Sequence, residues 1–488
     1  MPKPLFASAL IALASCAAWM LSGIAAPFAW QTRYDEARLL QCLVLGLLLV
    51  TTAISPAAVW EALRRIPSWV RCSLVAALLL GSLSASRSHF AAYAFCEVAF
   101  TAALIATGIG VRACVSSDDG RFAIALLLLV CCGSLALGLR FGTEYIAVVV
   151  EHDGSALESS WHPFQNPRYF AKAATWTLPL LWLAPRLTLR FHRPLQYGSA
   201  AATVLIWSQL LGSGSRGALL GMAVSVVVAA IFFGRSGRAY GIWQTACATA
   251  GLLLWGFFAL FYDVSTPDHI ARTGLSGRDD LYRAALLDIR SAPVIGIGPL
   301  HYSELGRHAE TSVAGTHNLP LQLAAEWGLP ATLLLLAPLL ALGWRLFVLA
   351  RESGVAGAVS PQQPMRIAIF SSIAAAMVHG LFANVANEPI SQTLFVLLAG
   401  LFPGAAPPEV HASRSPAWQG RLLMATLLLA IGAGLIFAIA KGWDCVGQPD
   451  RKDYVRGTGD SIYPRLWSQG LIPLERSCYD RASLDQPR

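Results

Sequence analysis

The chain has 488 residues, of which 55% are hydrophobic and 13% charged, and its mean hydropathy is +0.55. Soluble proteins carry roughly 25% charged residues, and apolar runs of about 18 or more residues recur along the whole chain, so a soluble globular protein is excluded and an all-α polytopic membrane protein is predicted. The formal net charge of +8 does not indicate nucleic acid or another acidic partner, because lysine and arginine gather in cytoplasmic loops during membrane insertion.

The apolar runs predict about 12 or 13 transmembrane helices. Loops on one side are short and basic, for example Arg64–Arg65, 186–194 and 351–366. The positive-inside rule makes that side cytoplasmic, and it puts the opposite loops in the periplasm or outside. The first run is too long for the apolar region of a cleavable signal peptide. The spans are expected near 5–29, 38–59, 69–86, 89–111, 122–139, 169–185, 196–212, 217–233, 240–261, 319–349, 367–385, 389–403 and 421–440.

Three longer segments are expected in the periplasm, from about 139 to 168, from about 262 to 318, and after Lys441. Several arginines lie on that side, where membrane insertion does not favour them, so we expect an anionic ligand at the outer leaflet. The expected organisation is N-terminal transmembrane helices (1–160), central transmembrane helices (161–261), a large periplasmic loop (262–318), C-terminal transmembrane helices (319–440) and a periplasmic tail (441–488).

Cysteines and paired carboxylates offer few chemical sites. Eight of the ten cysteines lie in or beside apolar spans, where they are expected to be small buried hydrophobic residues. Cys445 and Cys478 fall in the predicted periplasmic tail, where they form either a disulfide or two free thiols. Asp118-Asp119 is typical of a solvated loop. Asp279-Asp280 either caps a helix or, with further oxygen ligands that the sequence does not identify, holds a metal.

Two stretches put cations where a span begins. In QNPRYFAKAATWTLPLL (165–181), Asn-Pro marks a turn, and Arg168 and Lys172 share a helix face. They either direct paired charges to the outer leaflet or anchor the helix in headgroups. In LGSGSRGALLG (211–221), Arg216 stands among small residues. It either snorkels to headgroups or presents a planar guanidinium to phosphate oxygens.

The large outer loop contains SGRDDLYRAALLDIRSAPVIGIGPLHY (276–302), which predicts a short amphipathic helix ending at Pro293 and a Gly-Ile-Gly turn. Arg278 lies at the start of this helix. Arg278, Arg283 and Arg290 cannot all face one way on this helix, and we expect Arg283 and Arg290 to be interfacial anchors.

A polar stripe opens the next span, in GTHNLPLQLAAEWGLP (315–330). Asn318, Gln322 and Glu326 recur at helical spacing, and His317 lies beside them. Polar groups at membrane depth are costly and usually face a protein interior or a watery cavity. The stripe therefore indicates either a functional site or hydrogen bonds that lock helices together.

In this order, SRGALLG, GRDDLYRAAL with PVIGIG, and THNLPLQLAAEWG resemble the bacterial O-antigen ligase and O-oligosaccharyltransferase superfamily. The resemblance covers roughly residues 160–400. Within that superfamily, NPRYFAKAATWTLPLL looks like the corresponding stretch of pilin-type, protein-modifying O-oligosaccharyltransferases.

The resemblance implies a multi-helix inner-membrane glycosyltransferase that needs no cofactor, metal or nucleotide sugar. Such enzymes move a glycan from undecaprenyl diphosphate, on the periplasmic face, to a hydroxyl of a protein such as pilin or of lipid A-core. By motif, the implied catalytic residues are His317, Arg216 and Arg278. The expected substrate-binding residues are Arg168, Lys172, Asn318, Gln322 and Glu326.

On this hypothesis, His317 is the general base for the acceptor hydroxyl, because the imidazole pKa of about 6.5 suits the task. Arg216 and Arg278 would hold the diphosphate, whose departure needs charge stabilisation more than a general acid. A direct displacement would invert the anomeric centre. Glu326 would orient either His317 or the helix.

Two departures bear on the acceptor. Several protein-modifying members have a histidine where this chain has Gly315, and some carry a large C-terminal domain where this tail is short. An O-antigen ligase acting on lipid A-core is therefore the first alternative, followed by a glycan polymerase. A secondary transporter would show inverted repeats with ionisable residues at mid-membrane, and no such repeat is visible. A structural scaffold accounts poorly for the arginines and His317.

Overall fold

The computed structural model describes most of the chain, and its regular elements are helices. The described residues are 4–22, 33–54, 56–115, 121–152, 154, 157, 164, 166–187, 192–262, 264, 278–304, 307, 315–355, 362–401, 430–437, 439–440 and 472. Within them, an isolated bridge between Glu304 and Ile472 is the only β contact. The helices are α1 (Pro4–Ser22), α2 (Arg33–Ile54), α3 (Pro56–Arg64), α4 (Ser68–Arg87), α5 (Ala91–Val115), α6 (Arg121–Glu151), α8 (Pro167–Leu187), α9 (His192–Gly212), α10 (Arg216–Phe232), α11 (Gly234–Phe261), α12 (Arg278–Ser291), η2 (His301–Ser303), α13 (Leu319–Trp327), α14 (Leu329–Val355), α15 (Gln363–Gly380), η3 (Val385–Asn387) and α16 (Pro389–Gly400).

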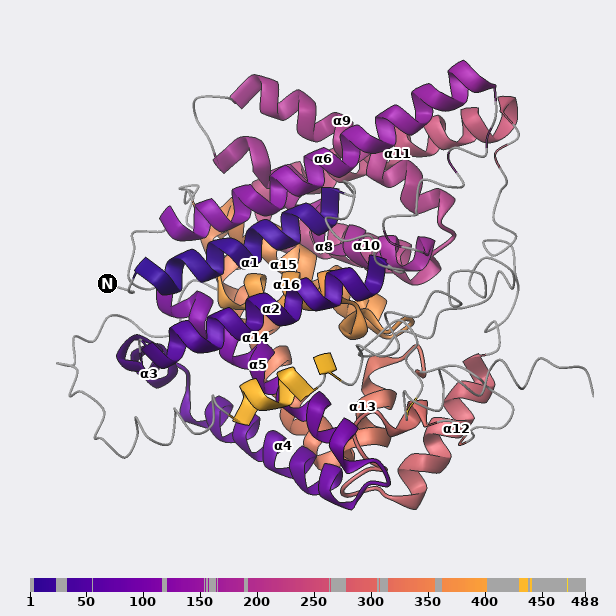
Figure 1. Ribbon diagram of the computed structural model, residues 1–488. Helices are drawn as coiled ribbons and strands as arrows, with labels where there is room; N and C mark the ends of the chain where they lie inside the picture. Colours follow the sequence, from indigo (N-terminus) through magenta and orange to yellow (C-terminus); the bar gives the residue numbers. More distant parts are fainter. Residues whose placement is uncertain are drawn as a thin grey trace, which may run out of the picture.

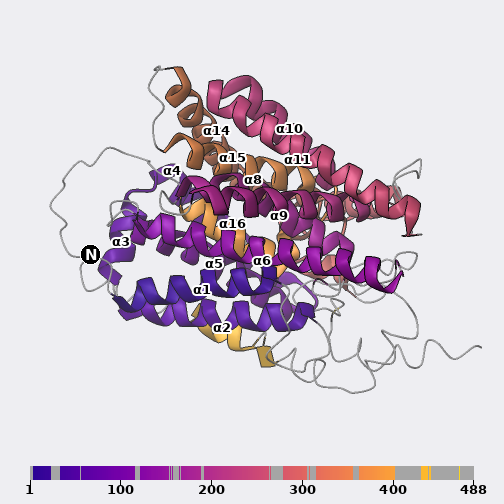
Figure 2. The same cartoon turned by 90° about the horizontal axis from the view of Figure 1, so that it is seen from above.

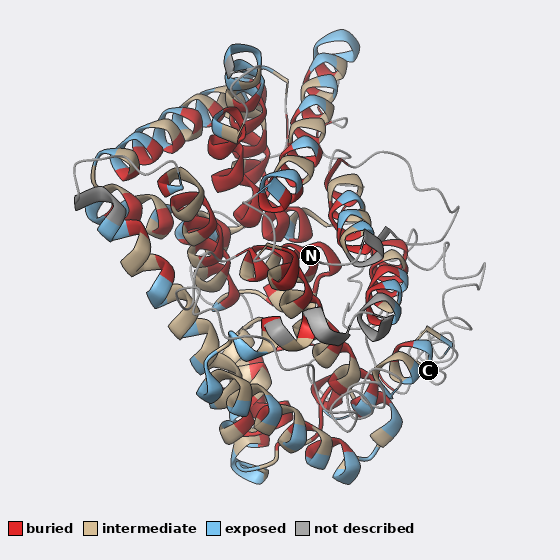
Figure 3. Cartoon of the chain, turned by 90° about the vertical axis from the view of Figure 1, so that its left-hand side faces the viewer, coloured by how far each residue is buried: buried red, intermediate tan, exposed pale blue. Residues whose placement is uncertain are grey.

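Helix α8 lies at the centre of the bundle. It packs against α6, α9, α15 and α16, and every residue from Tyr169 to Pro185 is buried. Helices α1 and α2 lie side by side on one flank, and α10 and α11 lie on the other (Figures 1 and 2). Buried residues gather in the interior of the bundle (Figure 3). Lys172, which lies in this buried run, is therefore part of the core, whereas Arg168 precedes the run and is exposed.

The helices have the length and composition of membrane spans. Among the described residues, α4, α5, α6, α11 and the Leu329–Glu352 part of α14 are long and apolar enough to cross a bilayer. Helices α11 and α14 leave large apolar side chains exposed, such as Leu260 and Leu333, as lipid-facing surfaces do. The expectation of an all-α polytopic membrane protein is confirmed.

Two helix boundaries differ from the predicted spans. Helix α6 runs to Glu151 instead of ending near 139, and an ion pair between Arg140 and Glu144, one turn apart, supports the extension. The expected span 319–349 is two helices, α13 and α14, divided at Gly328. Gly328 adopts a φ of 84°, which only glycine reaches without strain, and Pro330 follows at the start of α14, where its missing N–H costs nothing.

The Gly-Ile-Gly turn docks on this helix break. Ile297 N donates to Ala325 O at 2.9 Å, and Gly298 N donates to Glu326 O at 3.0 Å. A Cβ at Gly296 would collide with the Glu326 carbonyl, so the close approach requires glycine there. The large loop is thereby fixed to the membrane helices, and α12 packs on α13.

The cysteine predictions are tested in part. Five of the eight described cysteines are buried, as expected, whereas Cys72 and Cys132 are exposed and Cys16 is intermediate. Cys445, Cys478 and the Asp118-Asp119 pair lie outside the described residues. Of the expected span 421–440, residues 430–437 and 439–440 are described, and they are helical.

Candidate functional site

Three arginines singled out from the sequence come together at helix N-termini. Arg168 is the second residue of α8, and Arg216 and Arg278 are the first residues of α10 and α12. Burial lowers the pKa of the Arg278 guanidinium, and the nearby charges of Arg168 and Arg216 lower it further. A cation at a helix N-terminus is repelled by the positive end of the helix dipole. These positions therefore cost helix stability, and they concentrate positive potential in one place.

His317 is held at the edge of this cationic cluster by a rigid loop. Its φ of 54° is in the left-handed region, which costs roughly 1–3 kcal/mol for a non-glycine residue. The hydroxyl of Thr316 donates to Asn318 O at 2.7 Å and accepts from Asn318 N at 3.1 Å, bridging the histidine. Asn318 caps α13 by accepting from Leu321 N, and it donates to Leu381 O at the end of α15. The backbone at His317 is thus fixed by its neighbours on both sides.

Burial, and then the nearby cations, keep His317 unprotonated. The side chain is half-buried, and burial lowers its pKa to about 3, with the charges of Lys172, Arg168 and Arg278 acting in the same direction. The imidazole is therefore neutral near pH 7. Three of the four cations that the sequence singled out as site residues act on His317, and the fourth, Arg216, acts on Arg278.

Lys172 occupies a different environment from the one that headgroup anchoring requires. It is 5% exposed, and its Nζ lies over the Tyr169 ring, 4.6 Å from the centroid. Arg168, one turn earlier, is exposed. The carboxylate of Glu388 interacts electrostatically with Lys172. Anchoring in headgroups is thus the wrong reading of Lys172, which points inward from the buried helix α8.

The polar stripe of α13 serves more than one contact. Glu326, 1% exposed, accepts from Tyr302 N at 3.2 Å, and this bond ties α13 to η2 in the large loop. Its backbone carbonyl also accepts from Ser84 Oγ. Asn318 instead caps the helix. These contacts agree with a role for Glu326 in orienting the helix, which was one of the two roles expected for it.

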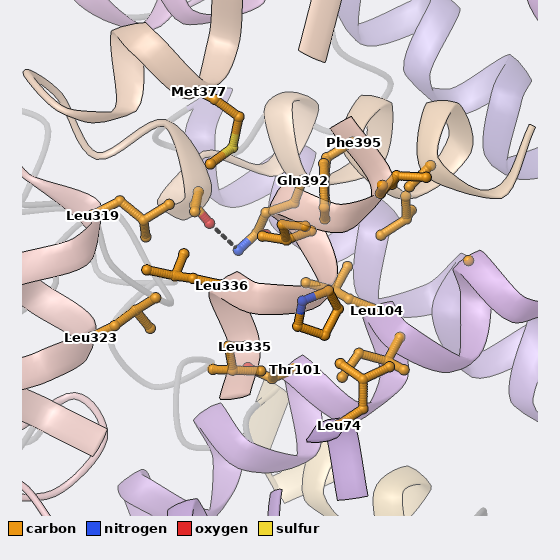
Figure 4. Close-up of a pocket in the computed structure, with 18 of the residues that line it drawn as sticks. Leu74, Thr101, Leu104, Leu319, Leu323, Leu335, Leu336, Met377, Gln392 and Phe395 are labelled. Atoms are coloured by element: carbon orange, nitrogen blue, oxygen red, sulfur yellow. Dashed lines mark hydrogen bonds between the residues drawn. The ribbon is translucent and has the colours of Figure 1, made fainter. Parts of the chain in front are cut away.

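An apolar cavity of about 490 Å³ opens beside the cluster. Leucines of α4, α5, α13 and α14 surround it, together with Met377, Gln392 and Phe395 (Figure 4). Its lining includes Trp176, which follows Lys172 by one turn of α8, and Gln322, five positions after His317, together with Arg112 and Arg345. The cavity, here called the apolar channel, is thus lined by residues that are close in the chain to Lys172 and His317.

Three polar residues near the cluster were not identified from the sequence. His379, at the end of α15, is 2% exposed, and its Nε2 lies 3.5 Å from the hydroxyl of Ser215, next to Arg216. Among the described residues its Nδ1 has no hydrogen-bond partner. Glu388 and Asn384 come from the segment between α15 and α16. His379 lies at the end of an apolar run, and Asn384 and Glu388 lie between two such runs, a pattern that sequence periodicity does not distinguish from buried structural residues.

The departure at Gly315 has a physical explanation. A Cβ at this position would fall on the side-chain nitrogen of Asn384 and lie 2.9 Å from Gln322 Oε1. A histidine, present there in several protein-modifying members of the superfamily, has no room beside Asn384. The space that it would need is filled by two amides.

The acidic pair Asp279-Asp280 lies in the first turn of α12 and is exposed. Carboxylates at that position are attracted by the positive end of the helix dipole. In the part of the chain that the structure describes, no three histidine, cysteine, aspartate or glutamate side chains gather as a metal site would require.

Comparison with known families matches residues 201–336 to a family described as O-antigen ligase. This matched region of the chain is here called the O-antigen ligase domain. The resemblance to that superfamily is thereby confirmed, and the chain is a membrane glycan transferase that acts on a lipid-linked glycan and an acceptor. No curated protein matches the chain. The O-antigen ligase domain contains Arg216, Arg278 and His317, whereas Lys172 and Glu388 lie outside it.

Proposed function

We propose that the protein transfers a glycan from undecaprenyl diphosphate to a serine or threonine hydroxyl of a periplasmic protein such as pilin. The observation that carries the proposal is the cluster of Arg168, Lys172, Arg216 and Arg278 around a neutral His317, beside an apolar channel. The cluster matches a diphosphate, and the channel matches a long hydrocarbon chain. A lipid diphosphate carries both parts in one molecule.

The arginines bind the diphosphate of the donor in this proposal. Guanidinium groups form paired hydrogen bonds with phosphate oxygens, and helix N-termini provide further N–H groups and positive potential. Because α8, α10 and α12 begin at these arginines, side chains and helix dipoles act on the same anion. Their attraction increases as the bond to the sugar breaks and negative charge builds up on the leaving diphosphate.

The apolar channel accommodates the first isoprene units of the donor. Leucines are its most frequent lining residues, so the hydrocarbon chain passes from the channel into the bilayer along an apolar surface. Trp176 and Gln322, which also line the channel, follow Lys172 and His317 closely in the chain.

His317 accepts the proton in the proposed reaction. The acceptor oxygen attacks the anomeric carbon, the bond from that carbon to the diphosphate oxygen breaks, and the acceptor proton moves to the imidazole. Undecaprenyl diphosphate leaves with the bonding electrons, and the anomeric centre is inverted. The bound diphosphate offsets the charges of Arg168, Lys172 and Arg278, so it raises the pKa of His317 above that of the empty site.

The NPRYF–TWTLPLL stretch supports a protein acceptor. It leads into α8 and carries Arg168 and Lys172 of the cluster. The alternative is an O-antigen ligase that transfers the glycan to lipid A-core, and the family match favours this reading. A polymerase, which would extend one donor glycan with another, is a third candidate. All three use the same donor chemistry, so the acceptor alone separates them.

The test is glycan transfer in a deletion strain that carries wild type, His317→Ala or a control, His89→Ala. The side chain of His89 is 74% exposed and forms an ion pair with Glu304 in the outer loop, so the control removes a histidine outside the cluster. Pilin mass and lipopolysaccharide banding are measured in the same cells at matched membrane levels. We expect pilin to lose a glycan-sized mass with His317→Ala only. Loss of the lipopolysaccharide ladder alone selects the ligase, and wild-type behaviour in both assays refutes the mechanism.

A further inference from the structure

A buried arginine of the N-terminal helices reaches the segment that borders the cluster. Arg38, on α2, is 1% exposed. Its Nη2 donates to the hydroxyl of Tyr34 at 2.9 Å and to the carbonyl of Asn387 at 2.5 Å. Its Nη1 donates to Gln41 Oε1 at 2.7 Å and also to Gln392. One guanidinium therefore joins α2 to η3 and to α16.

The partners of Arg38 hold the rest of the same segment. Gln392 Nε2 donates to Ala386 O at 2.6 Å, the hydrogen bond drawn in Figure 4. Gln41 Nε2 donates to Pro389 O at 3.1 Å. The carbonyls of Ala386 and Asn387, between α15 and α16, and that of Pro389, the first residue of α16, thus find side-chain donors. The Asn387 carbonyl also accepts from the Tyr34 hydroxyl at 2.6 Å, and the Pro389 carbonyl also accepts from Thr393 Oγ1 at 2.8 Å. Carbonyls left without donors in an apolar interior would be costly, so these bonds determine the path of the backbone.

Glu388 lies between the carbonyls that this network holds. Its carboxylate caps α16 by accepting from Ile390 N at 3.1 Å and from Ser391 N at 2.6 Å. The same carboxylate interacts electrostatically with Lys172, and Lys172 in turn acts on His317. Because the neighbouring carbonyls and the Glu388 carboxylate all accept hydrogen bonds, Glu388 is held in a single position beside the cluster.

We propose that Arg38 is a positioning residue for glycan transfer, which acts through Asn387 and Glu388 on the charges around Lys172 and His317. The inference rests on the proposed function. It extends the site to α2, far outside the O-antigen ligase domain at 201–336. Arginine is required because its planar fork reaches acceptors on three sides, whereas lysine offers one compact ammonium on a flexible stem.

The test compares Arg38→Lys and Gln41→Leu with a matched control, Gln244→Leu. Gln244 is also a buried amide that links helices, because it accepts from Trp207 Nε1 at 3.0 Å and donates to Leu178 O at 2.8 Å, but its partners lie away from η3. Each protein is purified into lipid nanodiscs and assayed with an undecaprenyl diphosphate-linked glycan and the acceptor found above. Turnover per folded molecule, the donor KM and amide hydrogen exchange over residues 384–389 are measured.

We expect Arg38→Lys to lower kcat by roughly 10²-fold, as a displacement of about 1 Å in a catalytic group does, with less than a threefold change in donor KM. Exchange over 384–389 rises in Arg38→Lys and Gln41→Leu. Gln244→Leu lowers thermal stability and leaves kcat per folded molecule unchanged. Equal loss of kcat in the control, or an unchanged kcat in Arg38→Lys, overturns the inference.

The two proposals fail differently. If wild type transfers no glycan to any acceptor, the proposed function is wrong, and the inference falls with it. If wild type transfers glycan and His317→Ala does not, while Arg38→Lys keeps its kcat, only the positioning role is wrong.

Discussion

Adding a single methyl group at Gly315 should damage the site without removing any functional group. The new Cβ of Gly315→Ala would fall on the side-chain nitrogen of Asn384, and it would lie 2.9 Å from Gln322 Oε1. Both amides are buried, so moving them out of the way disturbs their packed neighbours. Overpacking of this kind costs about 1–3 kcal/mol. Gly315 precedes His317 by two residues, and a displacement of about 1 Å at the base lowers kcat by roughly 10²-fold.

The matched control is Gly343→Ala, in the interior of α14. No atom lies within 4 Å of a Cβ at Gly343, so alanine stabilises the helix there by about 0.5–1 kcal/mol. Thermal unfolding and glycan transfer per folded molecule are measured for both variants. Adding Asn384→Ala to Gly315→Ala makes room for the methyl group, and the pair should show a coupling energy of at least about 1 kcal/mol. Wild-type melting temperature and turnover in Gly315→Ala would refute the packing argument.

Two further predictions concern the conformation and the pKa of the base. Thr316→Val removes the hydroxyl that bridges His317. At about 1 kcal/mol for a typical hydrogen bond, it should lower kcat roughly fivefold while His317 is still present, and unchanged single-turnover rates would contradict this. Arg168→Gln removes one of the charges that lower the pKa of His317, so the acid limb of the kcat/KM profile should move to higher pH. A pH titration of transfer by both proteins measures the shift, and an unmoved or lower limb would show that Arg168 does not act on the base.

The cationic cluster could be predicted from the sequence because each of its residues belongs to a local pattern. Arg168, Arg216 and Arg278 each stand where a turn gives way to a helix, and such starts are marked by glycine, serine or proline. His317 and Asn318 stand at the cap of α13 for the same reason. A local pattern also marks the break at Gly328, because glycine followed by Leu-Pro ends one helix and begins another. The continuous apolar run over 319–349 instead predicted a single helix there.

Arg38 and Glu388 could not be found in the same way, because their role depends on helices that are distant in the chain. Arg38 is separated from Asn387 by 349 positions, and nothing in α2 alone distinguishes it from an interfacial anchor. His379 likewise comes next to Ser215 only through the packing of α10 on α15. Local periodicity gives the face of a helix, but it does not identify the helix that this face meets.

In the proposed function, the cations that bind the diphosphate also weaken the base. Burial and the charges of Lys172, Arg168 and Arg278 hold the pKa of His317 at about 3, so the imidazole binds protons poorly. A bound diphosphate adds negative charge among the same groups, and the proton affinity of His317 must rise because that charge favours imidazolium. The base therefore becomes effective when the donor is in place. Since an acceptor that arrives first meets a weak base, activation of its hydroxyl is coupled to the presence of the glycan that it receives.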